Sequence, residues 1–380
     1  MKTERLILSL ALGMLMLGGC GSGGGDDGES AVSSCESLPI DKSALPPVPP
    51  SLSFSANPLY YQQWAIHYDA DFYRRNGIDP DASIHMDGEH NFIGRGVKVA
   101  VIDDGLDLSH EDLAGAVIAA YDIESGSGNV WPCCDTENHG TMVTGVIAAR
   151  NNGTGIVGTA PGSGIYFIRL PFDRAVYVSD IVEAFDRAKV WGADVVNCSW
   201  GSGDVDDAVR AAIADLAYNG RGGRGTVIVF AAGNEGSDIG KDESSLPEVF
   251  AVGATNRANL RTYYSNYGSA LDFMAPGGES IGIATLDQMG SAGLSTTSVV
   301  NYLLYNDVNT FGGTSASAPI VTGVVAQLLE ANPSLTRQNV YDALRCSADK
   351  IGNVAYDANG FNPYYGYGKI NAEAALRVVR

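Results

Sequence analysis

Short apolar runs without alternation recur along the chain, and such runs are typical of strands buried on both faces. Stretches with helical periodicity at residues 178–191 and 205–218 lie between some of them. This succession predicts an α/β fold with a mostly parallel β-sheet and helices on both faces, in a single domain. The predicted strands are residues 96–102, 165–170, 193–199, 226–231 and 249–253.

Two further helical stretches are rich in small residues. One covers residues 142–149, and the other covers residues 320–330 after Gly313-Thr-Ser-Ala-Ser-Ala-Pro319. Small residues let another backbone approach closely, and the start of a helix stabilises negative charge. Ser315 is therefore a candidate nucleophile, although a lone serine there is more often a helix cap. Residues 281–310 are irregular and poor in charge, which predicts a long loop just before this serine.

A nucleophilic serine needs a general base, and the base needs a group that orients it. Asp103 follows the first predicted strand, and catalytic groups in parallel sheets gather at the carboxyl ends of strands. His139 stands at a predicted helix start, where its neighbours give it little apolar cover. An isolated Asp at a strand end is often only a helix cap. The succession Asp, His, Ser nevertheless predicts nucleophilic catalysis.

The amino terminus has the pattern of an export signal. A short charged start precedes an apolar run at residues 6–17, which is too short to span a bilayer comfortably, and Gly18-Gly19-Cys20 follows. Leu17-Gly-Gly-Cys20 resembles the lipobox of bacterial lipoproteins, which implies cleavage before Cys20 and a lipid on its thiol. A plain secretory peptide is the alternative. The predicted organisation is a signal peptide at 1–19, a Gly/Ser/Asp/Pro-rich tether at 20–55 and a globular domain at 56–380.

Charge and cysteine content narrow the possible partners. The 380 residues include 44 acidic and 24 basic side chains, and the formal net charge is −20. Such a surface repels nucleic acid and anionic membranes and attracts cationic ligands. The six cysteines include no CxxC pair, so a zinc site is not expected, and their connectivity cannot be read from the sequence.

Four motifs together resemble the signatures of the subtilisin-like serine proteases, and they span most of residues 55–380. They are Val101-Ile-Asp-Asp-Gly105, Asn138-His-Gly-Thr141, Phe230-Ala-Ala-Gly-Asn234 and Gly313-Thr-Ser-Ala-Ser-Ala-Pro319. The order Asp, His, Ser is that of subtilisin. The resemblance implies a subtilisin-like fold, a nucleophile at Ser315, a base at His139 and an orienting carboxylate at Asp103. It also implies an oxyanion donor at Asn234, peptide or protein substrates and no catalytic cofactor.

Within that family, several passages resemble the kexin and furin branch, which cleaves after basic residues. They are Gln62-Gln-Trp64, Asp103-Asp-Gly105, Asn219-Gly-Arg-Gly-Gly-Arg-Gly225 and Leu328-Leu-Glu-Ala-Asn332. The resemblance implies acidic first and second pockets at Asp204 and Asp104. It places the remaining substrate contacts at Ser199, Trp200, Gly201, Ala231, Ala232 and Gly233. Asn266 stands where that branch carries a calcium-binding glutamate, and a shortened loop leaves Asp238 and Asp242 only approximately aligned.

The same resemblance implies one structural Ca²⁺ site. Its ligands would be the side chains of Asn57, Asp112 and Asn152 and the carbonyls of Thr154 and Ile156, a set of oxygens that suits Ca²⁺. Asn57 replaces the usual aspartate of the branch, which should weaken binding. An Asn-Gly turn without an ion is the alternative.

The leading interpretation is an exported, lipid-anchored serine endopeptidase that favours Arg or Lys before the scissile bond. Its expected location is the bacterial outer membrane or cell surface, or the medium if it is released. A broad-specificity degradative protease and a catalytically silent binding module are the alternatives. The stretch before Asn57 offers few apolar residues for a folding pro-domain, so a separate folding chaperone or inhibitor is a possible partner.

Overall fold

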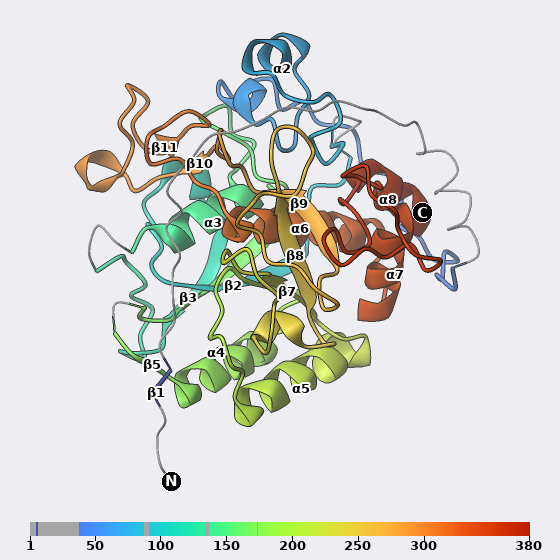
Figure 1. The fold of residues 1–380 in the computed structure, drawn as a ribbon. Helices are drawn as coiled ribbons and strands as arrows, with labels where there is room; N and C mark the ends of the chain where they lie inside the picture. The colour runs from blue at the N-terminus through green and yellow to red at the C-terminus, as the bar shows by residue number, and fades with distance from the viewer. Residues whose placement is uncertain (1–4, 7–37, 87–90, 134–136, 173) are drawn as a thin grey trace.

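A seven-stranded parallel sheet forms the centre of the molecule (Figure 1). The computed structural model describes residues 5–6, 38–86, 91–133, 137–172 and 174–380. Strand order in the sheet is β3-β4-β2-β6-β7-β8-β9, and every neighbouring pair is parallel. The bounds are β2 Lys98–Asp103, β3 Val117–Asp122, β4 Gly164–Arg169, β6 Val195–Cys198, β7 Val227–Ala231, β8 Phe250–Thr255 and β9 Phe273–Pro276.

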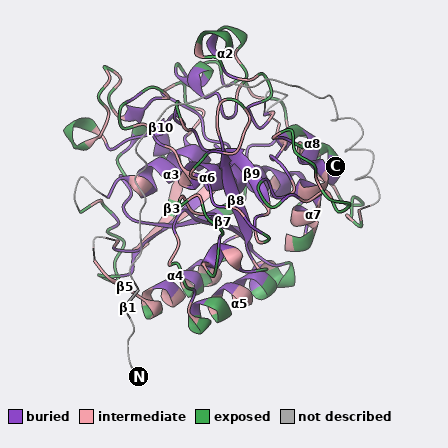
Figure 2. Ribbon diagram, viewed as in Figure 1, coloured by how far each residue is buried: buried purple, intermediate pink, exposed green. Residues whose placement is uncertain are grey.

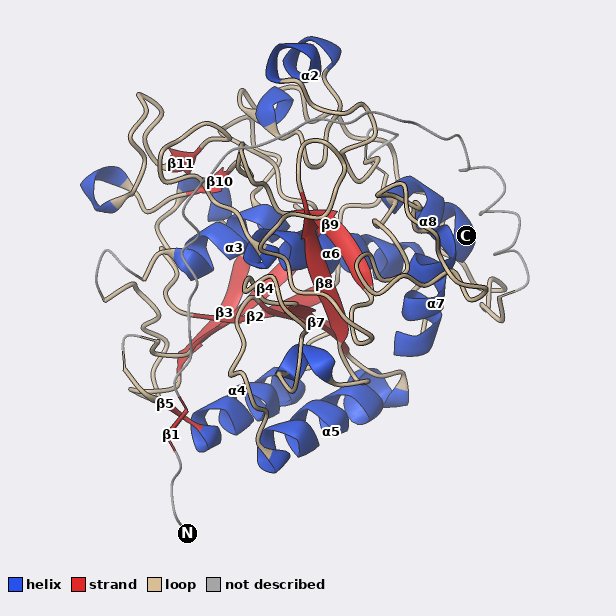
Figure 3. Ribbon diagram, in the orientation of Figure 1, coloured by secondary structure: helices blue, strands red, loops and turns tan. Residues whose placement is uncertain are grey.

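Helices cover both faces of this sheet (Figure 3). Helices α4 and α5 lie on one face, and α3 and α6 lie on the other (Figure 1). The side chains of β2 show the division: Val99 and Val101 join the core under α3 and α6, whereas Ala100 and Ile102 join the core under α4 and α5. The bounds are α2 Ala70–Asn76, α3 His139–Ala148, α4 Val178–Trp191, α5 Asp207–Gly223, α6 Thr314–Ala331, α7 Arg337–Ser347 and α8 Ala372–Val379. The predicted fold class is confirmed.

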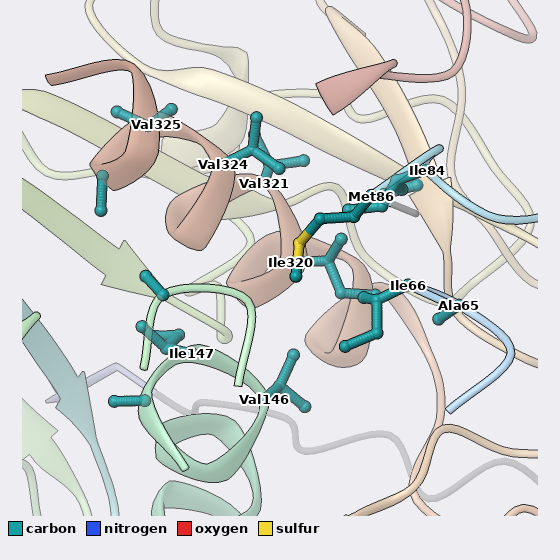
Figure 4. Close-up of a cluster of buried hydrophobic side chains, with 14 of the residues drawn as sticks. Ala65, Ile66, Ile84, Met86, Val146, Ile147, Ile320, Val321, Val324 and Val325 are labelled. Carbon is teal, nitrogen blue, oxygen red and sulfur yellow. The ribbon is translucent and has the colours of Figure 1, made fainter. Parts of the chain in front are cut away.

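Helix α6 is the central buried helix. All of its residues are buried except Ser315 and Glu330, which are the second and the second-last. Figure 2 shows this helix among buried segments, and Figure 4 shows Ile320 next to Ile66 and Met86 of the amino-terminal segment. A small residue also serves close packing here, because a Cβ on Gly323 of α6 would overlap Thr159.

The loop predicted at residues 281–310 has some regular structure. It contains the short strands β10 Thr285–Leu286 and β11 Tyr302–Leu303, which pair antiparallel, and a 3-10 turn η4 Gly290–Ala292 between them. A second small pair joins β1 Arg5–Leu6 to β5 Val176–Tyr177. The remaining 3-10 turns are η1 Tyr60–Gln62, η2 Glu111–Leu113 and η3 Glu243–Ser245.

The second half of the segment predicted as a tether at 20–55 does not behave as a tether in the structure. From residue 38 onward it packs on the domain, and Phe54 is a buried core residue. The carbonyl of Asp41 accepts from Asn332 Nδ2 at 2.9 Å, and that of Pro46 accepts from Arg380 Nη2 at 2.9 Å. The composition predicted a free linker, but the backbone carbonyls of a Pro-rich segment without helix or strand can still accept hydrogen bonds from the domain. Residues 20–37, including Cys20, lie outside the described residues.

Among the described residues, none of the helices is both long and apolar enough to cross a membrane.

Candidate active site

The three predicted catalytic residues stand at the ends of three different elements. Asp103 is the last residue of β2, His139 is the first of α3, and Ser315 is the second of α6. Apart from His139, every residue of α3 is buried. Two buried helices therefore each expose one polar side chain at their amino-terminal ends, next to the carboxyl end of a central strand.

Asp103 and His139 are hydrogen-bonded. The distance from His139 Nδ1 to Asp103 Oδ1 is 2.7 Å, and the Asp103 side chain is fully buried. Burial acts to lower the pKa of His139, but the charge and hydrogen bond of Asp103, with the charge of Asp104, raise it to about 9. The carboxylate thus fixes the ring so that Nδ1 carries a proton and Nε2 is left for a substrate or nucleophile.

Asp104 has a role other than the expected second-pocket acid. Its carboxylate is buried and accepts the backbone N–H groups of Gly105, His139 and Gly140, at 2.5, 3.2 and 2.6 Å. Both oxygens are thus turned toward the start of α3 and away from solvent. Burial and the neighbouring Asp103 raise the pKa of Asp104 to about 7. In this structure Asp104 caps the catalytic helix instead of lining a pocket.

Ser315 lies where helix α6 begins. Its hydroxyl donates to Ser199 O at 3.1 Å, and Ser199 Oγ donates back to Ser315 O at 3.1 Å. The preceding Gly313 has φ +87°, and a Cβ there would lie 3.2 Å from Asn234 Oδ1. Glycine therefore allows both the left-handed turn into the helix and the close approach of Asn234. Phe311 contacts the His139 ring edge-on, with centroids 5.7 Å apart.

Asn234 is oriented by the same turn. Its Oδ1 accepts from Thr314 N at 2.9 Å and from Thr314 Oγ1 at 3.0 Å. With the oxygen held by two donors, the amide nitrogen is directed elsewhere, beside the first turn of α6. The backbone N–H of Ser315 is one of the groups that an α-helix leaves without an internal partner at its start. These two donors are suited to a developing oxyanion.

The expected substrate contacts lie beside this turn. Ser199 and Trp200 follow β6, and the indole Nε1 of Trp200 donates to Ile102 O at 2.8 Å. Ala231 ends β7, Ala232 is buried, and Gly233 is partly exposed. Asp204 is exposed and pairs through its backbone with Lys241.

Two acidic side chains that sequence reasoning did not place lie against Gly201 and Ser202, beside the expected substrate contacts. The carboxylate of Asp242 fills the space that a Cβ on Gly201 would need, with its oxygens 2.2 and 2.7 Å from that position. Ser202 N donates to Asp242 Oδ1 at 3.1 Å and to Glu243 Oε2 at 3.0 Å. Burial, then the neighbouring Glu243, raises the pKa of Asp242 to about 8. The sequence aligned Asp242 only approximately and gave no signal for Glu243.

Asn266 explains the shortened loop after Asn234. Its Oδ1 accepts from Glu235 N at 3.1 Å and from Ser237 N at 3.0 Å, and its Nδ2 donates to Glu235 Oε2 at 2.7 Å. One amide therefore holds the loop by hydrogen bonds, at the position where the kexin and furin branch carries a glutamate.

The residues expected to bind Ca²⁺ gather around the loop that follows α3. Asp112 is buried; its Oδ2 accepts from Ile156 N at 3.1 Å, and its Oδ1 has no hydrogen-bond partner. The side-chain oxygens of Asn57 and Asn152 accept from Gly153 N and Thr154 N. Within the described ranges, no cluster of three His, Cys, Asp or Glu side chains could hold a metal. A single carboxylate with an unpartnered buried oxygen, flanked by amide oxygens, fits one Ca²⁺ ion.

Comparison with known proteins agrees with this geometry. Residues 94–368 match the subtilase family. A calcium-dependent protease of Nostoc is 35% identical over 312 residues, covering 75% of this chain and 46% of that protein. Subtilisin of Bacillus pumilus is 34% identical over 300 residues, covering 78% of this chain and 95% of that protein.

Solved structures show the same fold. The serine protease of Aeromonas sobria in complex with its chaperone has a TM-score of 0.71 at 24% identity, covering 91% of this chain and 71% of that one. This chain spans 46% of the length of the Nostoc relative, which is less than half of that protein. The family match covers well over half of the sequence, and the chain belongs to the subtilase family of serine endopeptidases.

Proposed function

We propose that the protein is an exported serine endopeptidase that uses Asp103, His139 and Ser315 and prefers Arg or Lys before the scissile bond. The observation that carries the proposal is the 2.7 Å bond between His139 and Asp103 beside a partly exposed Ser315 at the start of α6. A silent binding module would not need this arrangement, together with an oriented Asn234.

In the proposed reaction, Ser315 Oγ attacks the carbonyl carbon of the scissile peptide and its proton passes to His139 Nε2. The hydroxyl must therefore turn from Ser199 O to the imidazole. Asn234 Nδ2 and Ser315 N donate hydrogen bonds to the carbonyl oxygen as negative charge develops on it. The C–N bond then breaks as His139 gives the proton to the leaving amine, and water repeats the sequence to release the acyl group. His139 must be neutral to act as base, and its raised pKa favours catalysis at alkaline pH.

The proposed basic preference is supported by the acidic groups around Gly201. Asp242 lies against Gly201, Glu243 accepts from Ser202 N, and Asp204 is exposed nearby. A guanidinium that reaches a desolvated carboxylate forms a strong, charge-assisted bond. An apolar residue in the same place leaves that carboxylate unpaired, which costs about 1 to 3 kcal/mol, or roughly tenfold to a hundredfold in kcat/KM.

We expect wild-type protein to cleave peptides with Arg or Lys before the scissile bond faster than matched peptides with Phe or Leu. Because the pKa of Asp242 is raised to about 8, the Arg-to-Phe ratio of kcat/KM should increase between pH 7 and pH 9. Titration of His139 cancels in that ratio. Asp242→Asn should flatten the increase, and Asp204→Asn should lower the ratio at every pH.

The matched control for this series is Asp206→Asn. It removes a nearby negative charge, but Asp206 caps α5 by accepting from Ala208 N, and asparagine caps a helix equally well. Its selectivity should equal that of the wild type. Equal or faster turnover of the Phe and Leu peptides by the wild type would instead identify a broad-specificity degradative protease.

We also propose that Ca²⁺ binds at Asp112, Asn152 and Asn57 and stabilises the domain. A cation bound only to the native state adds RT ln(1 + [L]/Kd), roughly 2.7 kcal/mol at a hundredfold excess over Kd. Thermal melts should show a higher midpoint with Ca²⁺ than with chelator, and Asp112→Asn should remove the difference. Identical midpoints for a wild type verified to be metal-free beforehand would refute the site. The Nostoc relative, named a calcium-dependent protease, supports the proposal.

Export is supported by the signal-like start and by the disulfide at Cys346, because disulfides persist mainly in oxidising compartments. We propose that Cys20 carries a lipid anchor. Two or more acyl chains give stable attachment, whereas one chain binds only marginally. Wild-type protein should enter the detergent phase of a cell extract, and Cys20→Ser should stay in the aqueous phase. Aqueous partition of both would argue for a plain secretory peptide.

A separate folding chaperone is a further proposed partner. Support comes from the chaperone complex of the Aeromonas sobria protease. Purified, denatured chain should regain little activity when diluted alone. Full recovery without any added protein would remove this proposal.

A further inference from the structure

A buried ion cluster outside the catalytic residues links the sheet to the segment that carries His139. Its members are Asp122, Glu137 and Arg169, all nearly inaccessible to solvent. Arg169 Nη1 donates to Asp122 Oδ1 at 2.9 Å. Its Nη2 donates to Glu137 Oε1 at 2.7 Å and to Oε2 at 2.9 Å, and its Nε donates to Oε2 at 3.2 Å. Burial opposes the charge of Arg169, but its bonds to Glu137 and Asp122 raise its pKa.

The place of Arg169 in the sheet gives the cluster its geometry. Arg169 is the last residue of β4 and lies in register with Asp103 on β2 and with Asp122 on β3. The next residue, Leu170, donates its N–H to Asp103 O at 2.8 Å. The backbone at this strand end therefore fixes the catalytic aspartate, while the side chain of Arg169 reaches Glu137.

Glu137 in turn holds the segment that leads into α3. Its Oε2 also accepts from Cys133 N at 2.9 Å, so one carboxylate ties residue 133 to residue 137. His139 follows two residues later. The carbonyl of Glu137 would be 2.9 Å from a Cβ on Gly105, which places the backbone against the end of β2. Arg169 thus connects the end of β2 with the start of α3. The separation of these two ends sets the distance between Asp103 and His139.

We propose that Arg169, acting through Glu137, is a positioning residue that holds His139 at hydrogen-bonding distance from Asp103. The inference rests on the proposed triad. Asp122 accepts from the same guanidinium but belongs to β3, so it connects Arg169 to a strand that does not carry His139. The two halves of the cluster therefore differ in what they should do to catalysis.

The charged groups that act on the imidazole are Asp103 and Asp104, both at the end of β2. Phe311 contributes only its ring. Hence greater mobility at the start of α3 should weaken the hydrogen bond between Asp103 and His139. The pKa of His139 should then fall from about 9 toward its ordinary range. The acid limb of kcat/KM and the low-field proton resonance of His139 Nδ1–H report this change independently of overall stability.

The test compares Arg169→Lys and Glu137→Gln with Asp122→Asn. Lysine keeps the charge but loses the two-pronged contact. Glutamine keeps the shape and one acceptor oxygen, which preserves a folded variant if lysine does not. Both should lower kcat by about tenfold to a hundredfold with little change in KM, because an ångström of misplacement costs on that order. Both should also move the acid limb to lower pH and weaken the low-field resonance.

Two controls isolate positioning from stability. Asp122→Asn should lower the melting temperature while kcat and the acid limb stay at wild-type values. Arg95→Lys removes a similar contact, Arg95 Nη1 to Glu330 Oε1 at 2.8 Å, at the opposite end of α6 from Ser315. It too should leave the acid limb unmoved.

The proposal is overturned if Arg169→Lys and Glu137→Gln melt earlier but keep the wild-type kcat, acid limb and resonance below their melting temperatures. Failure of the triad itself would look different. In that case Ser315→Ala would still hydrolyse peptides, whereas an inactive Ser315→Ala beside a fully active Arg169→Lys would reject only the positioning role.

Discussion

Ser315→Ala is expected to abolish peptide hydrolysis while the folded domain persists. A subtilisin-type triad acts as a unit, so loss of its serine costs about 10⁶ in kcat and leaves only the contribution of the oxyanion donors and binding. Labelling by an organophosphonate should disappear with the activity, because the reagent has no hydroxyl left to attack it. Both effects are measured on purified protein with a peptide substrate and with a labelled phosphonate.

The fold should tolerate this change because the Ser315 hydroxyl donates one hydrogen bond, to Ser199 O. The matched control is Ser317→Ala, two residues along the same helix. Ser317 is buried, and its hydroxyl donates to Ala275 O at 3.0 Å. That variant should lose about 1 kcal/mol of stability and keep full activity and labelling. Hydrolysis at wild-type rate by Ser315→Ala would remove Ser315 as the nucleophile and the proposed mechanism with it.

The central strands were predictable because burial on both faces leaves a continuous apolar run. Strands β2, β6, β7 and β8 are buried almost throughout, and each was predicted. The edge strands were not. β3 mixes exposed, partly exposed and buried positions, so it resembles neither a buried run nor a clean alternation. β9 has four residues and ends in Pro276, which reads as a turn.

Asp103, His139 and Ser315 could be singled out as candidate catalytic residues because each lies in a short motif at an element end. The contacts that surround these residues could not be predicted from the sequence. Whether Asp104 faces a substrate or the start of α3 depends on where residues 137–140 come to lie, and that is a tertiary property. Glu137 and Arg169 are 32 residues apart, and Ser202 and Glu243 are 41 apart. No local pattern connects such pairs, so only the assembled sheet reveals them.

Asn234→Ala is expected to lower kcat by about 10² to 10³ and to leave KM nearly unchanged. The reason is that the proposed mechanism directs the Asn234 amide at the oxygen where negative charge develops only during reaction, so its contribution is made in the transition state. In free-energy terms the loss is roughly 2.7 to 4 kcal/mol. Unlike Ser315→Ala, this variant should still be labelled by the phosphonate, more slowly.

Alanine at position 234 also removes the acceptor of Thr314 N and Thr314 Oγ1, which could disturb the start of α6. Asn234→Asp separates the two effects, because aspartate keeps an acceptor for Thr314 but places an oxygen where the donor was. We expect at least the same loss in kcat for Asn234→Asp, with a melting temperature close to that of the wild type. A drop of less than tenfold in both variants, measured with a saturating Arg-containing peptide, would mean that another donor stabilises the oxyanion and that Asn234 only shapes the turn before Ser315.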